Sequence, residues 1–224
     1  MLNSPKINQS SIKIKRALIS VFDKTGVVSF ARSLHLSGVK IMSTGGTAKT
    51  LRNSDVPVAD VSDYTKFPEI MDGRVKTINP LIEGGILGLR DIHNNDAKTN
   101  KIQWIDLVVC NLYPFLDVIN SKDSNLAMAL ENVDIGGPTM IRSAAKNLGW
   151  ACVVVDPEDY SAVIEELALG KISFDTRQKL SVKAFGYTAK YDAIIHNHLR
   201  PDVLTENLSL TFEKHSEMRY GENP

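Results

Sequence analysis

The fold is decided by the stretch Ala17-Leu-Ile-Ser-Val21, its turn Phe22-Asp-Lys-Thr-Gly26, and the run Val39-Lys-Ile-Met-Ser43 that follows. The two apolar runs are short and rich in Val and Ile, which is typical of strands buried on both faces of a sheet. The segment between them, Gly26–Leu36, has a helical pattern. A strand, a helix and a second strand predict two parallel strands joined by a crossover helix.

The same alternation continues along the chain. Further strands are expected at Ile105–Cys110 and Ala151–Val155, with a weaker one at Val58–Val61. Further helices are expected at Thr47–Asn53, Asn125–Glu131, Pro138–Asn147, Pro157–Leu169 and Phe174–Leu199. The pattern predicts an α/β fold: a doubly wound parallel sheet with helices on both faces, plus C-terminal helices. Such sheets bind ligands at the carboxyl ends of their strands.

The 224 residues are enough for one substantial domain, which we place at residues 16–199. Residues 1–15 are polar and predict a disordered N-terminal tail, not a signal peptide. Residues 200–224 are polar with little periodicity and predict a linker or extension.

Composition excludes several functional classes. Lys plus Arg and Asp plus Glu both number 26, so the net charge is zero, which argues against general affinity for nucleic acid or a membrane surface. No apolar run approaches membrane-spanning length. Cys110 and Cys152 lie in apolar runs, which predicts buried free thiols and a cytoplasmic location. His196 and His198 lack the partners that a metal site needs, so we expect no metal.

Two loops have the composition of a phosphate site. The loop Ser43-Thr-Gly-Gly-Thr-Ala48 follows a strand and opens a helix, where backbone N–H groups and the hydroxyls of Thr44 and Thr47 can bind an anion. An ordinary helix start with turn glycines explains this loop equally well. Gly73-Arg-Val-Lys-Thr77 adds two cations, although a cationic hairpin without a ligand is also common. Lys24 follows the first strand. No Walker A or G-x-G-x-x-G spacing is present.

Two further stretches carry groups that can bind an amide and transfer protons. Asn111 offers an amide donor and acceptor together, and Tyr113 offers a hydroxyl, unless it is a core aromatic. In Asp134-Ile-Gly-Gly-Pro-Thr-Met-Ile-Arg-Ser-Ala-Ala-Lys146-Asn147, an acid precedes a helix that we expect to begin at Pro138, and Arg142 and Lys146 share one face. The simpler explanation is a helix cap with two solvated cations.

These loops belong to an ordered set of motifs: D-K-T-G, S-T-G-G-T-A, S-D-Y-T-x-F-P-E, D-G-R-V-K-T, G-G-I-L, N-L-Y-P-F and D-I-G-G-P-T-M-I-R-S-A-A-K-N. Together they resemble the IMP cyclohydrolase domain of the bifunctional purine-biosynthesis proteins (AICAR transformylase/IMP cyclohydrolase), from about Arg16 to Pro224. The last residues, Arg219-Tyr-Gly-Glu-Asn-Pro224, look like the start of the transformylase domain. We therefore expect a cyclohydrolase half that stops just past the junction.

The resemblance implies a methylglyoxal-synthase-like (Rossmann-like) fold and closure of 5-formamidoimidazole-4-carboxamide ribotide to IMP with loss of water. It implies catalytic roles for Lys76, Tyr113, Asp134 and Lys146: Asp134 for the carboxamide, Lys76 and Tyr113 for the oxyanion, and Lys146 for the departing water. It implies that the substrate is bound by Lys24, Thr44, Gly45, Gly46, Thr47, Arg74, Thr77, Cys110, Asn111, Ile135 and Gly136. Arg142 is left as a structural cation. No cofactor or metal is implied, and family members are homodimers.

This chain departs from the family pattern at four positions. Phe22 stands where Ser is usual, Asn79 and Glu83 replace two histidines, and Leu89 replaces an arginine. Since the matched catalytic residues are all present, we expect activity. The alternative is a non-catalytic nucleotide-binding or allosteric module of the same fold. Methylglyoxal synthase is disfavoured because its catalytic Asp/His set has no evident match here.

Overall fold

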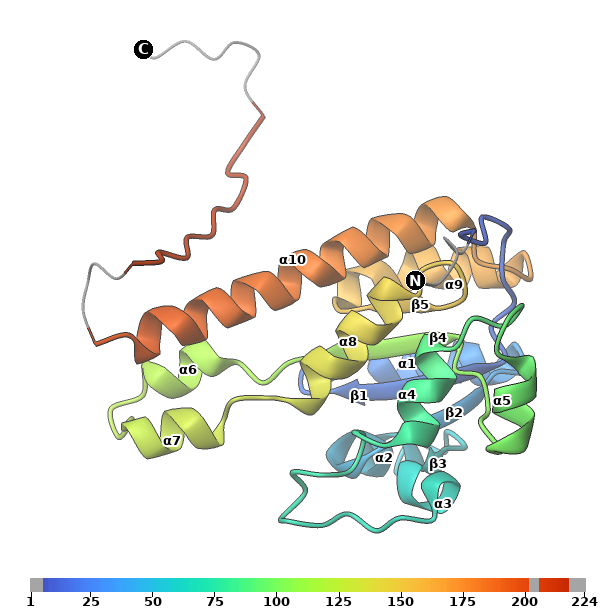
Figure 1. Ribbon diagram of the computed structural model, residues 1–224, viewed down its shortest axis with the longest axis horizontal. Helices are drawn as coiled ribbons and strands as arrows, with labels where there is room; N and C mark the ends of the chain where they lie inside the picture. Colours follow the sequence, from blue (N-terminus) through green and yellow to red (C-terminus); the bar gives the residue numbers. More distant parts are fainter. Residues whose placement is uncertain (1–5, 202–205, 218–224) are drawn as a thin grey trace.

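A computed structural model describes residues 6–201 and 206–217 and shows a five-stranded sheet of order β3-β2-β1-β4-β5, flanked by helices (Figure 1). The strands are β1 (Arg16–Val21), β2 (Lys40–Ser43), β3 (Ala59–Asp60), β4 (Leu107–Asn111) and β5 (Cys152–Val154). Every pair is parallel, and β1 lies in the centre between β2 and β4. The predicted parallel α/β fold is confirmed.

The longer predicted helices are also present. The helices are α1 (Val27–Leu36), α2 (Gly45–Arg52), α3 (Val61–Thr65), α4 (Pro80–Leu87), α5 (Asn94–Thr99), α6 (Phe115–Ile119), α7 (Leu126–Glu131), α8 (Gly136–Lys146), α9 (Tyr160–Ala168) and α10 (Phe174–Leu199). A 3₁₀ turn, Pro157–Asp159, precedes α9. Helix α8 begins two residues before Pro138, so Pro138 is its third residue and not its first. The first turn tolerates proline there because its N–H groups have no intrahelical acceptor.

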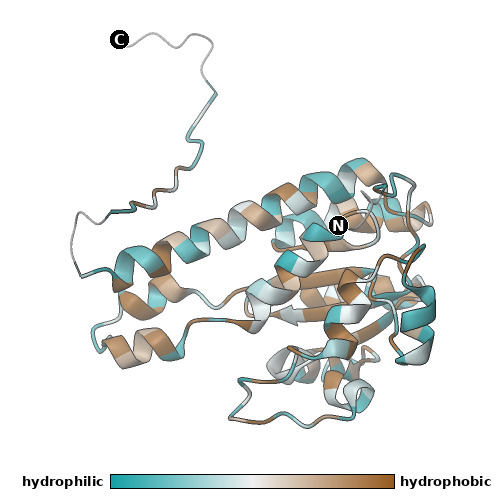
Figure 2. Ribbon diagram, in the orientation of Figure 1, coloured by the Kyte–Doolittle hydropathy of each residue, from teal (hydrophilic) through white to brown (hydrophobic). Residues whose placement is uncertain are grey.

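The strands bury alternate side chains on opposite faces of the sheet. Leu18 and Val108 belong to a core covered by α4, α8 and α10, whereas Ile19 and Leu107 belong to a core covered by α1 and α9. This arrangement explains why the strands read as continuous apolar runs, since neither face meets water. In Figure 2 the strands are mostly brown and the outlying α5 is mostly teal.

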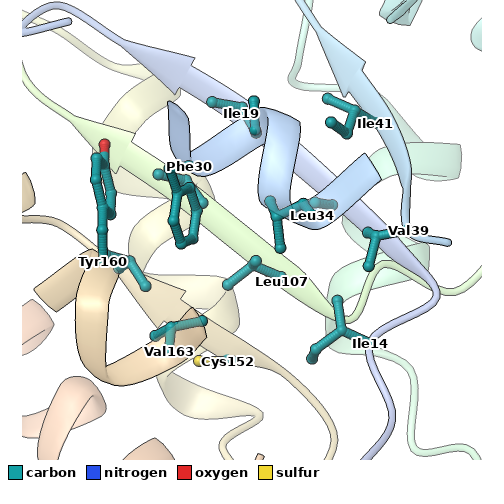
Figure 3. Packing of buried hydrophobic residues seen from close by; sticks show 14 of the residues in the cluster. Ile14, Ile19, Phe30, Leu34, Val39, Ile41, Leu107, Cys152, Tyr160 and Val163 are labelled. Atoms are coloured by element: carbon teal, nitrogen blue, oxygen red, sulfur yellow. The ribbon is translucent and has the colours of Figure 1, made fainter. Parts of the chain in front are cut away.

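An aromatic pair packs at the core between the sheet and helices α1 and α9. Phe30 of α1 stacks on Tyr160 of α9, with ring centroids 4.2 Å apart, and both rings lie over the sheet beside Leu107 (Figure 3). This contact joins two helices that are distant in sequence, so it fixes the position of the C-terminal part of the domain against the β1–α1 unit.

The segment before β1 differs from the disordered tail expected for residues 1–15. Ile12 exchanges two backbone hydrogen bonds with Ile172, of 2.9 and 2.8 Å, and both Ile12 and Ile14 are buried. The side chain of Asn8 donates to the carbonyl of Gly149 at 2.9 Å. An apolar side chain at every second position gives this short segment a buried face, which the overall polarity conceals. Residues 1–5 lie outside the described residues.

After α10, residues 206–217 form neither helix nor strand. They contact α10 through Asn197, whose amide donates to the Ser209 carbonyl at 2.8 Å, and through an ion pair between Lys190 and Glu213. The stretch Arg219–Pro224, which resembles the start of a transformylase domain, lies outside the described residues.

Both cysteines are buried and unpaired, as predicted. Within residues 6–201 and 206–217, no helix combines the length and apolar character needed to cross a bilayer.

A fully buried arginine ties three segments together. Arg177 of α10 donates to the carbonyls of Leu148 (2.7 Å), Ile172 (2.8 Å) and Ser10 (3.0 Å). These carbonyls belong to the approach to β5, the approach to α10 and the N-terminal segment. One guanidinium therefore satisfies buried acceptors from three separate parts of the chain.

Replacing Arg177 with Met should lower the free energy of unfolding by about 3 kcal/mol, because several buried carbonyls lose their donor. Denaturant unfolding of the whole chain measures the loss. The control is Lys179→Met, an exposed position on the same helix, which should change stability by less than about 0.5 kcal/mol. Equal effects of the two substitutions would contradict the role given to Arg177.

Candidate functional site

A cavity of about 720 Å³ opens at the carboxyl edge of the sheet. Its walls come from the loops after β1, β2 and β4, from residues 72–77, and from the start of α8. This is the edge at which open parallel sheets bind ligands, so the location agrees with the expectation from the strand pattern.

The cavity brings together nearly all the residues that the sequence singled out. The lining includes Lys24, Thr44, Gly45, Gly46, Thr47, Arg74, Lys76, Thr77, Cys110, Asn111, Tyr113, Asp134, Ile135 and Gly136. Lys146 does not line it. It is the last residue of α8 and is exposed, about 15 Å along the helix from Gly136 at 1.5 Å per residue. Arg142 is also exposed, and its guanidinium lies 5.7 Å from the ring centroid of Phe185.

The glycine loop forms an anion-binding helix start. Thr44 is extended and precedes α2, Gly45 has a left-handed φ of 49°, and no side chain in the described part of the chain caps the helix. The N–H groups of Gly45, Gly46 and Thr47 are therefore available at the positive end of the helix dipole.

The hydroxyl of Thr47 has a different role from the one predicted. It accepts a hydrogen bond from the Val21 N–H at 3.1 Å and donates to the Val21 carbonyl at 2.9 Å. It thus holds the end of β1 against α2 and is not free for a phosphate. Thr44 lies with its hydroxyl oxygen 3.4 Å from that of Ser20.

The cations of residues 73–77 are paired with carboxylates at the rim. Arg74 forms an ion pair with Glu131 of α7, and the Lys76 amine lies 3.4 Å from a carboxylate oxygen of Glu69. Exposed pairs of this kind contribute little to stability, so a ligand anion can replace the carboxylates at small cost. The glutamates were not anticipated, because neither lies at a fixed spacing from its partner.

Asn111 is buried and its amide is used by the protein itself. Its oxygen accepts from the backbone N–H groups of Phe22 (2.7 Å) and Asp23 (2.9 Å), and its nitrogen donates to the Asp23 carbonyl at 3.1 Å. The predicted reading of an amide edge of the substrate is therefore not what this geometry favours. Asn111 instead joins the end of β4 to the turn after β1, which carries Lys24.

Asn111→Ala should lower the free energy of unfolding by about 2 kcal/mol, since two N–H groups lose their acceptor. The backbone amides of Phe22 and Asp23 should exchange hydrogen faster, which NMR or mass spectrometry measures residue by residue. Asn120→Ala, at the exposed end of α6, is the matched control and should leave both amides protected. Unchanged exchange at Phe22 and Asp23 in the Asn111 variant would refute this role.

Asp134 is a mostly buried carboxyl group at the start of α8. One oxygen accepts from the Gly137 N–H at 2.8 Å. Burial raises the pKa of Asp134 above its ordinary value, and the N–H of Gly137 and the charge of Lys76 partly oppose the rise. Burial also raises the pKa of the neighbouring Cys110 thiol, which keeps it a neutral wall residue. Asp134 is therefore both a helix-capping acceptor and a group poised to take up a proton.

Two tyrosines of α10 support the site and were not found from the sequence. The hydroxyl of Tyr187 accepts from the Leu112 N–H at 2.9 Å, and that of Tyr191 accepts from the Asp134 N–H at 2.8 Å. Their spacing of four residues places them on one helix face, but nothing in the sequence indicates which loops that face meets.

Tyr113 is not a core aromatic. It is 47% exposed, and its ring centroid lies 4.4 Å from that of Phe22, which is 44% exposed and also lines the cavity. The first departure from the family pattern, Phe22, therefore contacts the predicted catalytic tyrosine directly.

The other three departures lie outside the cavity. Asn79 caps α4 by accepting from the Leu81 N–H at 2.9 Å. Glu83 accepts from the Ser143 hydroxyl at 2.7 Å, and burial raises its pKa. Leu89 follows α4, and its N–H donates to a ring nitrogen of His93 at 3.0 Å. These residues join α4 to its surroundings and do not reach the ligand space.

Comparisons with known proteins agree with this geometry. The MGS-like domain family matches residues 26–139, and the AICARFT/IMPCHase bienzyme family matches residues 144–224. The chain is 52% identical over 218 residues to the bifunctional purine biosynthesis protein PurH of Acetivibrio thermocellus, and 50% identical over 216 residues to that of Bacillus thuringiensis. Each alignment covers 94% of this chain and 42% of the relative, so the chain spans about two fifths of their length.

A solved structure is also similar. The crystal structure of ForH superposes with a TM-score of 0.72 and 32% identity, over 80% of this chain and 96% of that chain.

Proposed function

The chain belongs to the family of MGS-like domains, and we propose that it is the IMP cyclohydrolase part of a bifunctional purine-biosynthesis protein. It would close 5-formamidoimidazole-4-carboxamide ribotide to IMP with loss of water. The observation that carries the proposal is the cavity itself, whose lining combines a helix start suited to phosphate with Lys76, Tyr113 and Asp134.

The phosphate end of the substrate would lie against the glycine loop. The free N–H groups of Gly45, Gly46 and Thr47 supply directional donors. Lys24 and Arg74 supply charge from two other loops. A nucleotide phosphate would take the place that Glu131 now holds on Arg74.

The base would then lie toward Asp134. Formation of the new bond joins the carboxamide nitrogen to the formyl carbon, and the nitrogen must lose a proton. The Asp134 carboxylate is the acceptor for that proton, while the formyl oxygen gains negative charge. Lys76 and Tyr113 would stabilise this oxyanion, a kind of contact worth about 3 kcal/mol per donor. Because the attack is intramolecular, holding the two groups together supplies much of the catalysis.

The second half of the reaction expels the oxygen as water and completes the conjugated six-membered ring. The oxyanion needs two protons to leave as water: the one taken from the carboxamide nitrogen, and the one that the former formamide nitrogen loses as its double bond to the carbon forms. The resemblance assigned proton delivery to Lys146. Since Lys146 lies at the far end of α8, we propose that Asp134 returns the first proton and then carries the second from the formamide nitrogen to the departing hydroxyl group. A carboxyl group whose pKa is raised by burial suits this exchange. The overall reaction transfers no electrons, so its chemistry calls for no redox cofactor.

We also propose a homodimer in the cytoplasm. The family resemblance supports the dimer, and the exposed Leu126 and Leu130 of α7 give a surface that a second subunit can cover. The two free thiols suit a reducing compartment.

Ultraviolet detection of IMP formed from the formylated ribotide tests the activity. The wild-type chain should turn over, and Asp134→Asn should reduce kcat by about 10²–10⁴-fold, because the carboxylate is lost while its shape is kept. Arg142→Ala, an exposed change on the same helix, should leave kcat unchanged. Tight nucleotide binding by folded wild-type protein without turnover would favour the non-catalytic module instead.

The pH profile tests the role of Asp134. Since the basic form is the active one, kcat/KM should fall as the pH drops through the Asp134 pKa. Burial raises that pKa, so the acidic limb should lie above the ordinary aspartate value of 3.8. Initial rates across the acid range measure the limb. A limb at or below the ordinary value would exclude Asp134 as the base.

A further inference from the structure

A second cavity, of about 940 Å³, lies at the opposite edge of the sheet. Four of its lining residues stand at the starts of strands: Arg16 begins β1, Lys40 begins β2, Asp106 precedes β4 and Trp150 precedes β5. None of its lining residues is shared with the cavity at the carboxyl edge. It therefore forms a separate site, unrelated to the proposed cyclohydrolase chemistry.

The lining of this amino-edge cavity is strongly basic. It contains five cations, Lys13, Lys15, Arg16, Lys40 and Arg90, and one carboxylate, Asp106. Asp106 is already paired with Arg90, with 2.6 Å between the charged atoms. Four positive charges are thus left uncompensated in a chain whose net charge is zero. Among the described residues, Lys13, Lys15 and Lys40 have no ion-pair partner.

The backbone that carries these cations is held in place. Asp106 accepts from the N–H groups of Lys15 (2.7 Å) and Arg16 (2.8 Å), and the Lys40 N–H donates to the Lys15 carbonyl at 2.9 Å. The Arg16 guanidinium donates to the Trp104 carbonyl at 2.7 Å. The backbone positions of Lys15, Arg16 and Lys40 are therefore fixed next to one another, and these cations do not lie on a loose tail.

We propose that the amino-edge cavity binds a small anion with several linked phosphates. Neighbouring like charges repel, and an anion that contacts several of them at once removes that repulsion. Three phosphate groups can contact several cations together, whereas a single phosphate contacts fewer. Both a free oligophosphate and the phosphate chain of a nucleoside triphosphate have this chemistry.

The two indole rings make the site observable. Trp104 and Trp150 both line the cavity and are the two tryptophans of the chain. The guanidinium carbon of Arg90 lies close to both rings, 5.8 and 5.9 Å from their centroids. An anion that binds near Arg90 will change the electrostatic surroundings of both rings. Tryptophan fluorescence therefore reports on binding at this edge of the sheet.

The experiment titrates the whole chain with tripolyphosphate, ATP and orthophosphate, by tryptophan fluorescence and in parallel by equilibrium dialysis. Saturating IMP is present to occupy the other cavity, and a repeat without IMP shows that the result does not depend on the proposed cyclohydrolase. We expect saturable binding of tripolyphosphate, at least about tenfold tighter than that of orthophosphate and weakened by salt. Equal affinity for ATP and tripolyphosphate assigns recognition to the phosphates alone; tighter ATP binding identifies a nucleotide as the ligand.

Two matched double variants distinguish binding in the amino-edge cavity from nonspecific binding of anions by surface lysines. The double substitution Lys15→Ala with Lys40→Ala should weaken tripolyphosphate binding at least about tenfold. The control pair, Lys122→Ala with Lys179→Ala, removes the same charge from exposed positions outside the cavity and should bind normally. The proposal is overturned if dialysis shows no saturable binding, if orthophosphate binds as tightly, or if both double variants lose affinity equally. The lysines would then serve only the negative ends of helices such as α1.

Discussion

The parallel pairing of β1 with β2 on one side and with β4 on the other is the constraint on which the rest of the molecule depends. It forces the chain to leave β1 toward one neighbour and to return on the opposite side, so the connections diverge at the carboxyl edge. A crevice is left at that point, as in other doubly wound sheets. The turn that carries Lys24, the glycine loop after β2 and Tyr113 after β4 all meet there because of this strand order.

The site depends equally on polar groups that never need to touch a substrate. Asn111 joins the ends of β4 and β1, and Thr47 joins β1 to α2. Tyr187 holds the loop after β4, and Tyr191 holds the loop before α8. Each satisfies a backbone group that would otherwise be costly at a half-buried position. The loops are consequently held in one conformation before any ligand binds, which lowers the entropy lost on binding.

The sheet and the long helices follow from local sequence because apolar runs and helical periodicity record burial directly. The position of the candidate site follows too, because parallel strands bring their carboxyl ends to one edge. Short helices such as α3 and α6 do not, since five residues carry too little periodicity. The roles of individual residues within the site are harder still to predict from the sequence. The amide of Asn111 suits a substrate and a backbone equally. A spacing of i, i+4 says that Lys146 shares a helix face with Arg142, but not whether that face meets the cavity.

The same topology gives the two edges of the sheet opposite electrostatic characters. At the carboxyl edge, helix starts present N–H groups, and Glu69 and Glu131 balance the cations nearby. At the amino edge, helices end with their carbonyls, and a carboxylate partner is found only for Arg90 among the lining cations. An anion that binds at the carboxyl edge must displace these glutamates from the cations that they pair with. An anion at the second edge meets no such competitor, and its affinity depends mainly on charge and therefore on salt.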